Sequence, residues 1–168
     1  MKTEFVQLDT GITIEFARSA AVAAGSILFV HGLGTNLHQF EVQQRFFSQY
    51  FQVLLVSLRG HGGSTVPVHP RLAEFSIPQF AQDVKALLSR LDIHKVHFVG
   101  NSAGGLVGYQ LLRTNVELLA SLTTFGTTAE LHTSTSLLWF LTTLTRVLGP
   151  KTMGKLASVS TKDKAVAQ

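Results

Sequence analysis

Three short apolar runs, each followed at once by a glycine-rich segment, constrain the fold of this chain more than any other feature. They are SILFV before HGLG, FQVLLV before SLRGHG, and KVHFV before GNSAGG. Apolar runs of this length indicate strands that are buried on both faces. Residues 37–50 and 77–93 lie between them and repeat apolar side chains at helical spacing. This alternation predicts an α/β protein with a mostly parallel sheet and right-handed crossovers.

The flanking segments complete the predicted sheet. Residues 4–10 and 12–18 alternate in polarity around an Asp-Thr-Gly turn, which predicts an antiparallel hairpin ahead of the parallel strands. Residues 104–115 follow the third apolar run with a helical pattern, and residues 118–126 form the predicted sixth strand.

The pattern changes after the sixth strand. Residues 137–148 have the spacing of an amphipathic helix that ends at Gly-Pro, and no further strand is evident. We therefore expect residues 1–128 to form a partial sheet core, and residues 129–168 to form the start of a helical cap region or a frayed tail. The sixth strand then becomes an exposed apolar edge to which another segment or chain could dock.

Composition excludes several classes of function. The chain has no cysteine, which excludes disulfides, thiolate metal sites and a cysteine nucleophile. The net charge of +4 is spread along the sequence, so we expect no nucleic-acid partner. Its apolar runs are shorter than the ~18 residues of a membrane span, and no signal-peptide pattern opens the chain. We expect a cytoplasmic protein without a membrane span, metal or cofactor.

The candidate nucleophile is Ser102, in the segment GNSAG between a predicted strand and a predicted helix. A chain that turns this sharply holds the serine in a strained conformation with its hydroxyl exposed, and flanking Gly100 and Gly104 avoid clashes at the turn. The helix N-terminus behind the serine stabilises negative charge. The alternative is that the serine is an ordinary helix N-cap.

A second loop, HGLGTN, supplies the candidate oxyanion hole. We expect the backbone N–H groups of Leu33 and Ala103 to be its two donors, with His31, Gly32 and Gly34 shaping the loop. The alternative is a simple glycine-rich turn from strand to helix. The third loop, SLRGHGGS, ends another strand beside the same crevice.

These three loops, in this order and spacing, resemble the α/β-hydrolase superfamily over residues ~5–126. In that family H-G-x-G, D-x-R-G-x-G-x-S and G-x-S-x-G follow the third, fourth and fifth strands. Ser57 departs from the pattern, since the family usually has aspartate there. The resemblance implies an N-terminal hairpin and strands up to the sixth, with the chain ending before the last two. It is most similar to small esterases, monoacylglycerol-lipase-like and haloperoxidase-like members, while G-N-S-x-G-G also occurs in hydrolases of carbon-carbon bonds.

The catalytic acid and histidine that the resemblance implies are missing from the expected places. Glu130 and His132 are the candidates after the sixth strand, and His132 would need an unusual loop path to the serine. Among the other histidines, we expect His31 to fix the oxyanion loop. The remaining expectations are that His38 and His61 line the crevice mouth, that His94 and His97 lie far from the serine, and that Asp83 and Asp92 are solvated or capping residues.

The sequence thus predicts a serine hydrolase that acts on a small carboxylic ester or other acyl substrate, with a triad acid and histidine outside this chain. One alternative is a truncated hydrolase fold without catalysis that serves as a binding or interaction module, for which the exposed sixth-strand edge is the candidate surface. A further alternative is a carbon-carbon bond hydrolase of the same fold.

Overall fold

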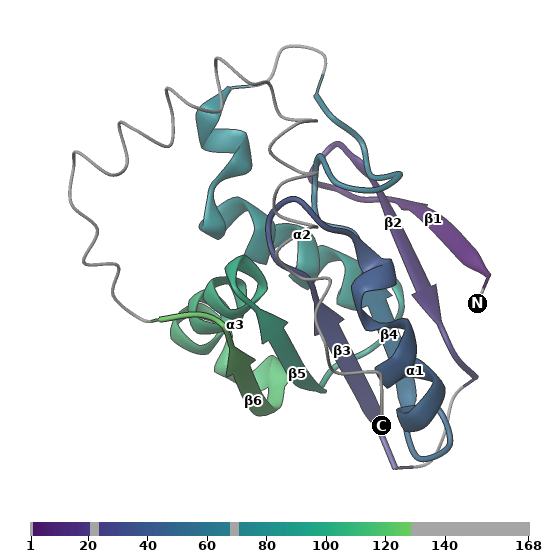
Figure 1. The fold of residues 1–168 in the computed structure, drawn as a ribbon. Coiled ribbons are helices and arrows are strands. Elements are labelled where there is room, and N and C mark those ends of the chain that lie inside the picture. Colours follow the sequence, from purple (N-terminus) through teal and green to yellow (C-terminus); the bar gives the residue numbers. More distant parts are fainter. Residues whose placement is uncertain (1, 21–23, 68–70, 129–168) are drawn as a thin grey trace, which may run out of the picture. The chain divides into compact units, whose positions relative to one another are not determined.

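The computed structural model describes residues 2–20, 24–67 and 71–128, and the sheet belongs to the unit Met1–Ala129. The predicted cap region, residues 129–168, lies outside the described residues. Six strands form one sheet in the order β1-β2-β4-β3-β5-β6 (Figure 1). They are β1 (Thr3–Gln7), β2 (Thr13–Arg18), β3 (Ser26–Val30), β4 (Gln52–Val56), β5 (Val96–Asn101) and β6 (Leu119–Phe125).

Strand direction follows the sequence prediction. β1 and β2 form the expected antiparallel hairpin, and β2 pairs antiparallel with β4. The neighbouring pairs among β4, β3, β5 and β6 are all parallel. A mostly parallel α/β sheet is therefore confirmed, with β6 at one edge of the described sheet.

Helices connect the parallel strands. They are α1 (Glu41–Phe47), α2 (Ile77–Arg90) and α3 (Ala103–Thr114), with short 3₁₀ helices η1 (Leu37–Phe40), η2 (Leu72–Phe75) and η3 (Val116–Leu118). The single helix predicted over residues 37–50 is divided. Phe40 has φ −112° and ψ 19°, and the chain passes there from η1 into α1.

Alternate residues of the central strands face opposite layers. Leu28 and Val30 of β3 belong to the cluster that includes α2 and α3 side chains, whereas Ile27 and Phe29 pack with Phe40 on the other face. Period-two alternation in a strand produces this division. The uniformly apolar sequences of β3 and β4 are thus explained, because both faces of these two strands are buried.

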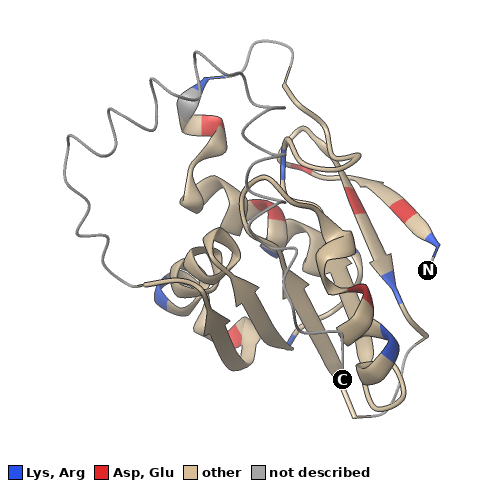
Figure 2. Cartoon of the chain, in the orientation of Figure 1, with Lys and Arg blue, Asp and Glu red and all other residues tan. Residues whose placement is uncertain are grey.

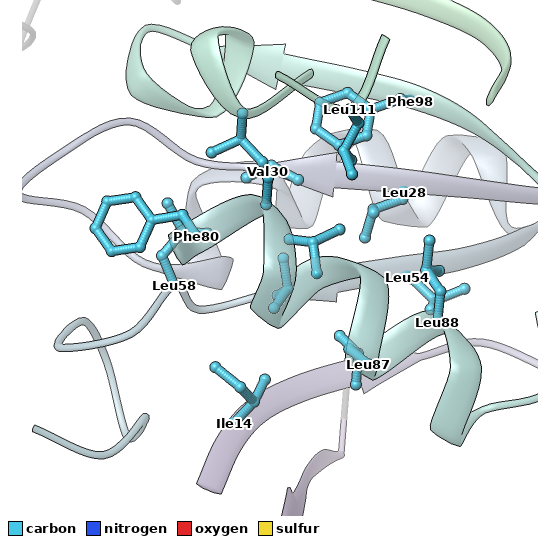
Figure 3. Packing of buried hydrophobic residues seen from close by; sticks show 14 of the residues in the cluster. Ile14, Leu28, Val30, Leu54, Leu58, Phe80, Leu87, Leu88, Phe98 and Leu111 are labelled. Atoms are coloured by element: carbon cyan, nitrogen blue, oxygen red, sulfur yellow. The ribbon is translucent and has the colours of Figure 1, made fainter. Parts of the chain in front are cut away.

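The larger cluster lies between the sheet and α2. Phe80, Leu87 and Leu88 of α2 share it with Leu28 and Leu54 of the central strands (Figure 3). Burial of each such side chain contributes about 1.5–3 kcal/mol to folding. This rigid layer holds the central strands on which the candidate site is built.

The register of the strands aligns the three glycine-rich loops at one edge of the sheet. Val30 of β3 pairs with Val56 of β4 and with Gly100 of β5. Because these strands are parallel, the residues that follow each of them emerge at the same edge, where sites of α/β sheets form.

Charged residues do not gather on one element of the described chain. Lys and Arg lie on α1, α2, α3, β2 and several loops, with Asp and Glu between them (Figure 2). Among the described residues, no helix is both long and apolar enough to cross a membrane.

Candidate active site

The chain bends sharply at Ser102, between β5 and α3. Ser102 has φ 50° and ψ −116°, and its side chain is exposed. A non-glycine residue in this region is strained by about 1–3 kcal/mol. No hydrogen bond joins the Ser102 side chain to another residue of the described part. The hydroxyl is thus held in the open by a bend that the surrounding structure enforces.

The two flanking glycines allow this bend because backbone approaches them closely. A Cβ on Gly100 would lie 2.5 Å from the carbonyl carbon and oxygen of Gly104, and a Cβ on Gly104 would lie 2.1 Å from the carbonyl oxygen of Val30. No real Cβ tolerates such distances. Both glycines of the motif are therefore required for the path of the chain.

The loop that follows β3 lies against the bend. A Cβ on Gly32 would come within 3.1 Å of the Ser102 Cβ, so the residue before Leu33 contacts the candidate nucleophile. Within the described residues, no hydrogen bond involves the backbone N–H of Leu33 or of Ala103. Gly34 has φ +77°, a left-handed conformation suited to glycine. Ala103 directly follows Ser102, and Leu33 directly follows Gly32, so both N–H groups belong to the two segments that meet at the bend.

His31 fixes the loop and is not available as a base. Its buried ring hydrogen-bonds through Nδ1 to the carbonyl of Gly32 at 2.6 Å, while Nε2 accepts from the N–H of Leu58 at 3.0 Å. Burial lowers the pKa of His31 from 6.5 to about 4, so the ring is neutral near pH 7. Because Nε2 is an acceptor, Nδ1 carries the proton. The His31 ring therefore joins the loop after β3 to the loop after β4.

The loop after β4 uses its polar groups to hold the structure together. The buried Ser57 hydroxyl donates to Glu15 at 2.6 Å and accepts from the N–H of Leu37 at 3.2 Å. Glu15 also accepts from the N–H of Gly63 at 2.8 Å. A glutamate on β2 therefore provides a carboxylate beside position 57, where the resemblance led us to expect an aspartate.

The prediction that Asp83 is a solvated or capping residue is wrong, because its side chain is buried and paired. Its carboxylate accepts two hydrogen bonds of 2.8 Å from Arg59, and both side chains are buried. This carboxylate raises the pKa of Arg59 above its ordinary value. The ion pair connects the loop after β4 to α2, and burial excludes it from the chemistry at the exposed edge.

Other histidines in the described part are not hydrogen-bonded to Ser102. The exposed His38 pairs with Glu41, and the half-buried His61 faces the carbonyl of Arg59 at 3.0 Å. His97 contacts the Ser121 hydroxyl at 2.9 Å, at the other end of β5. His94 is exposed and pairs with Asp92.

Two candidates for the triad remain. Glu130 and His132 fall outside the described residues. No group of three or more metal-ligand side chains occurs in the part that the structure describes. The candidate site within the described residues therefore consists of the candidate nucleophile and two candidate backbone donors.

Comparisons with known proteins identify the family of the chain. Residues 25–161 match the family described as alpha/beta hydrolase fold. The chain belongs to this family. A 100-residue region, 60% of the chain, is 35% identical to 3-oxoadipate enol-lactonase 2 of Acinetobacter baylyi and covers 36% of that protein. A 98-residue region, 58% of the chain, is 31% identical to fluoroacetate dehalogenase of Burkholderia sp. and covers 32% of it.

Solved structures of the family have the same fold. A hydrolase from Pseudomonas aeruginosa superimposes with a TM-score of 0.79 at 24% identity, over 98% of this chain and 63% of that one. Est816, an N-acyl homoserine lactone degrading enzyme, gives a TM-score of 0.66 at 29% identity, over 74% of this chain and 45% of that one. The chain spans about a third of the length of the two curated relatives, whose names describe hydrolases.

Two polar residues beside the site were missed by the sequence analysis. Gln39 of η1 and Asn101 at the end of β5 are joined by a hydrogen bond of 2.9 Å. Asn101 lies inside the G-N-S-A-G motif, which is a signal for its position near the nucleophile. Gln39 has no such signal, because its partner is 62 residues away in the sequence.

Proposed function

We propose that this chain carries the nucleophile and the oxyanion hole of a serine hydrolase that cleaves carboxylic esters, lactones included. The observation that supports the proposal is the exposed hydroxyl of Ser102 at a strained bend, together with the N–H groups of Leu33 and Ala103, which make no hydrogen bond within the described residues. Two fixed donors beside a serine suit the negative charge that develops on an ester carbonyl oxygen.

In the proposed reaction, Ser102 Oγ attacks the carbonyl carbon and loses its proton to a base. The N–H groups of Leu33 and Ala103 bind the resulting oxyanion, and each contributes ~3 kcal/mol of transition-state stabilisation. Collapse expels the alcohol, which takes the proton from the base, and water then releases the acid from the acyl-serine. The base and the acid that orients it are groups outside the described residues.

The names of two relatives support the ester class. An enol-lactonase and an N-acyl homoserine lactone degrading enzyme both act, by name, on lactones, which are internal esters. Cleavage of a carbon-carbon bond by the same residues stays a prediction from the sequence motif.

The test supplies the base from solution. The purified chain is incubated with an alkyl fluorophosphonate, with and without imidazole, and the mass of the peptide that contains Ser102 is measured. Imidazole should accelerate phosphonylation of Ser102, with loss of fluoride and transfer of the hydroxyl proton to imidazole. Ser102→Ala should abolish the adduct, while the exposed Ser89→Ala on α2 should leave it unchanged.

The second candidate is a binding or interaction module that retains the fold without catalysis. It is favoured by the lack, in the described part of the chain, of a base hydrogen-bonded to Ser102. The same experiment separates the two. If imidazole labels Ser102 no faster than other serines of the chain, the site lacks a working oxyanion hole and the module is the better account.

A further inference from the structure

The carboxamide of Gln39 joins the two segments that carry the proposed oxyanion donors. Its Nε2 donates to Oδ1 of Asn101 at 2.9 Å, and its Oε1 accepts from the backbone N–H of Gly32 at 3.2 Å. Gly32 precedes Leu33, and Asn101 precedes Ser102. The Gln39 side chain therefore connects the residue before the proposed donor with the residue before the proposed nucleophile. The N–H of Gly32 also determines the orientation of the amide, because only the carboxamide oxygen can accept it.

The partner carboxamide, that of Asn101, is held from its other end as well. Its Nδ2 donates to the carbonyl of Phe125 at 3.3 Å, and the N–H of Ser102 donates to the same carbonyl at 3.0 Å. Its Oδ1 lies 3.0 Å from the point where a Cβ on Gly32 would be. Asn101 is thus fixed between the end of β6 and the loop that contains Gly32.

The direction of the Leu33 N–H depends on the same loop contacts. The carbonyl of Gly32 accepts from Nδ1 of His31 at 2.6 Å, and the single hydroxyl proton of Thr35 can be donated either to this carbonyl at 2.9 Å or to Oε1 of Gln39 at 2.8 Å. A trans peptide is planar, so fixing this carbonyl directs the N–H of Leu33 to the opposite side. Gln39 accepts from the N–H of Gly32, one peptide earlier. This bond holds the peptide between Gly32 and Leu33 in position relative to Ser102.

We propose that Gln39 and Asn101 are positioning residues, whose mutual hydrogen bond sets the separation of the two oxyanion donors. The inference rests on the proposed function, because it concerns the same oxyanion hole. Leu33 and Ala103 belong to different segments of the chain, so strand pairing alone leaves the loop of residues 31–36 free to shift. The bond between the two carboxamides couples that loop to the bend.

Variants of Gln39 test the inference in the imidazole-assisted labelling of Ser102. Gln39→Ala removes the whole bridge. Gln39→Glu keeps an acceptor for the N–H of Gly32 but places an oxygen against Oδ1 of Asn101, so it loses only the bond between the segments. Both variants should lower the labelling rate at saturating probe by about 10-fold to 100-fold, with little change in the probe concentration for half-maximal rate.

The matched control is His38→Ala in the same 3₁₀ helix. His38 is exposed and its ring contacts Glu41 rather than the loop, so this variant should label at the wild-type rate. Asn101→Ala should slow labelling as Gln39→Ala does, and the double variant should be slowed by less than the product of the two single effects, because both single variants lose the same bond between the carboxamides.

The outcomes distinguish the inference from the proposal beneath it. If imidazole fails to label Ser102 in the wild type, the proposed function is wrong. If the wild type is labelled and Gln39→Glu is labelled at the same rate, only the positioning role is wrong. A second readout needs no reaction: the amide ¹H–¹⁵N signal of Leu33 should shift in Gln39→Glu and stay in place in His38→Ala, and an unmoved Leu33 signal in Gln39→Glu would overturn the inference.

Discussion

Ser57 and Ser102 both follow a buried parallel strand in a glycine-rich loop, yet their hydroxyl groups are in opposite situations. Ser57 is 0% exposed and its hydroxyl bridges Glu15 and the N–H of Leu37. Ser102 is exposed and makes no side-chain hydrogen bond within the described part of the chain. In the loop after β4 the serine hydroxyl is bonded within the protein and stabilises the fold. At the bend after β5 the serine hydroxyl faces solvent without a bond to the described residues. This contrast, rather than residue type, identifies the candidate site.

The largest loss of stability should come from breaking the buried ion pair between Arg59, in the loop after β4, and Asp83 of α2. Asp83→Ala leaves the Arg59 guanidinium buried without its carboxylate, and we expect the free energy of unfolding to fall by about 4 kcal/mol. Urea unfolding followed by circular dichroism measures the change. A loss below about 1 kcal/mol would show that the loop does not depend on this pair.

Two controls isolate the effect of burial. Glu4→Ala breaks the exposed pair with Arg18 and should cost less than about 1 kcal/mol. Replacing both partners, as Arg59→Met with Asp83→Leu, should recover more than half of the stability lost in Asp83→Ala, because no unpaired charge is then buried.

A second prediction breaks the bend itself. A Cβ on Gly104 would lie 2.1 Å from the carbonyl oxygen of Val30, so Gly104→Ala should lower the free energy of unfolding by about 3 kcal/mol. Gly105→Ala is the matched control in the same helix. Its Cβ would lie 2.5 Å from Cγ2 and 2.9 Å from Cβ of Thr127, which follows β6 outside any strand and can shift with its backbone, and alanine favours the helix by about 1 kcal/mol, so the loss should be smaller than in Gly104→Ala. Equal losses in the two variants would contradict the backbone argument.

Much of the fold could be predicted because its determinants are local in the sequence. The apolar run SILFV is too apolar for a surface strand, and the glycines around Ser102 mark a bend that no other residue permits. Asp83 was misassigned although a signal existed. It lies three residues after Phe80 and one before Val84, within the apolar stripe of α2, where a carboxylate needs a buried partner.

The rest of the site depends on contacts that sequence spacing does not encode. Gln39 meets Asn101 only because the register of β3 and β5 brings their following loops together. Glu15 meets Ser57 in the same way, since the pairing of β2 with β4 determines which carboxylate faces the hydroxyl. Tertiary pairing, rather than any local pattern, selects these partners.

A third prediction concerns His31, which bonds to Leu58 in the loop after β4 and to Gly32 in the loop after β3 that lies against the bend. Its folded-state pKa of about 4 lies below the ordinary 6.5, so the unfolded chain binds the proton more readily. Stability from this group is complete above pH 6.5 and is lost as the pH falls toward 4, by up to about 3 kcal/mol. Urea unfolding between pH 7 and 4.5 measures the slope.

Two variants test whether His31 causes this change of the free energy of unfolding with pH. His31→Asn cannot take up the proton, and its stability should change less with pH than that of the wild type. His61→Asn removes a ring whose centroid lies 5.1 Å from that of His31 and should keep most of the slope. A wild-type slope in His31→Asn would assign the pH dependence to other groups.

The smallest expected losses of stability come from replacing each of the two serines, and they test the difference between the two hydroxyl groups. Ser57→Ala leaves the Glu15 carboxylate and the N–H of Leu37 short of a partner and should cost about 2 kcal/mol. Ser102→Ala keeps the same backbone strain and removes an exposed hydroxyl without a hydrogen bond in the described part, so its free energy of unfolding should stay within about 0.5 kcal/mol of the wild type. If both variants lost equal stability, the hydroxyl of Ser102 would be a structural group like that of Ser57, and its availability for attack on an ester would have no support.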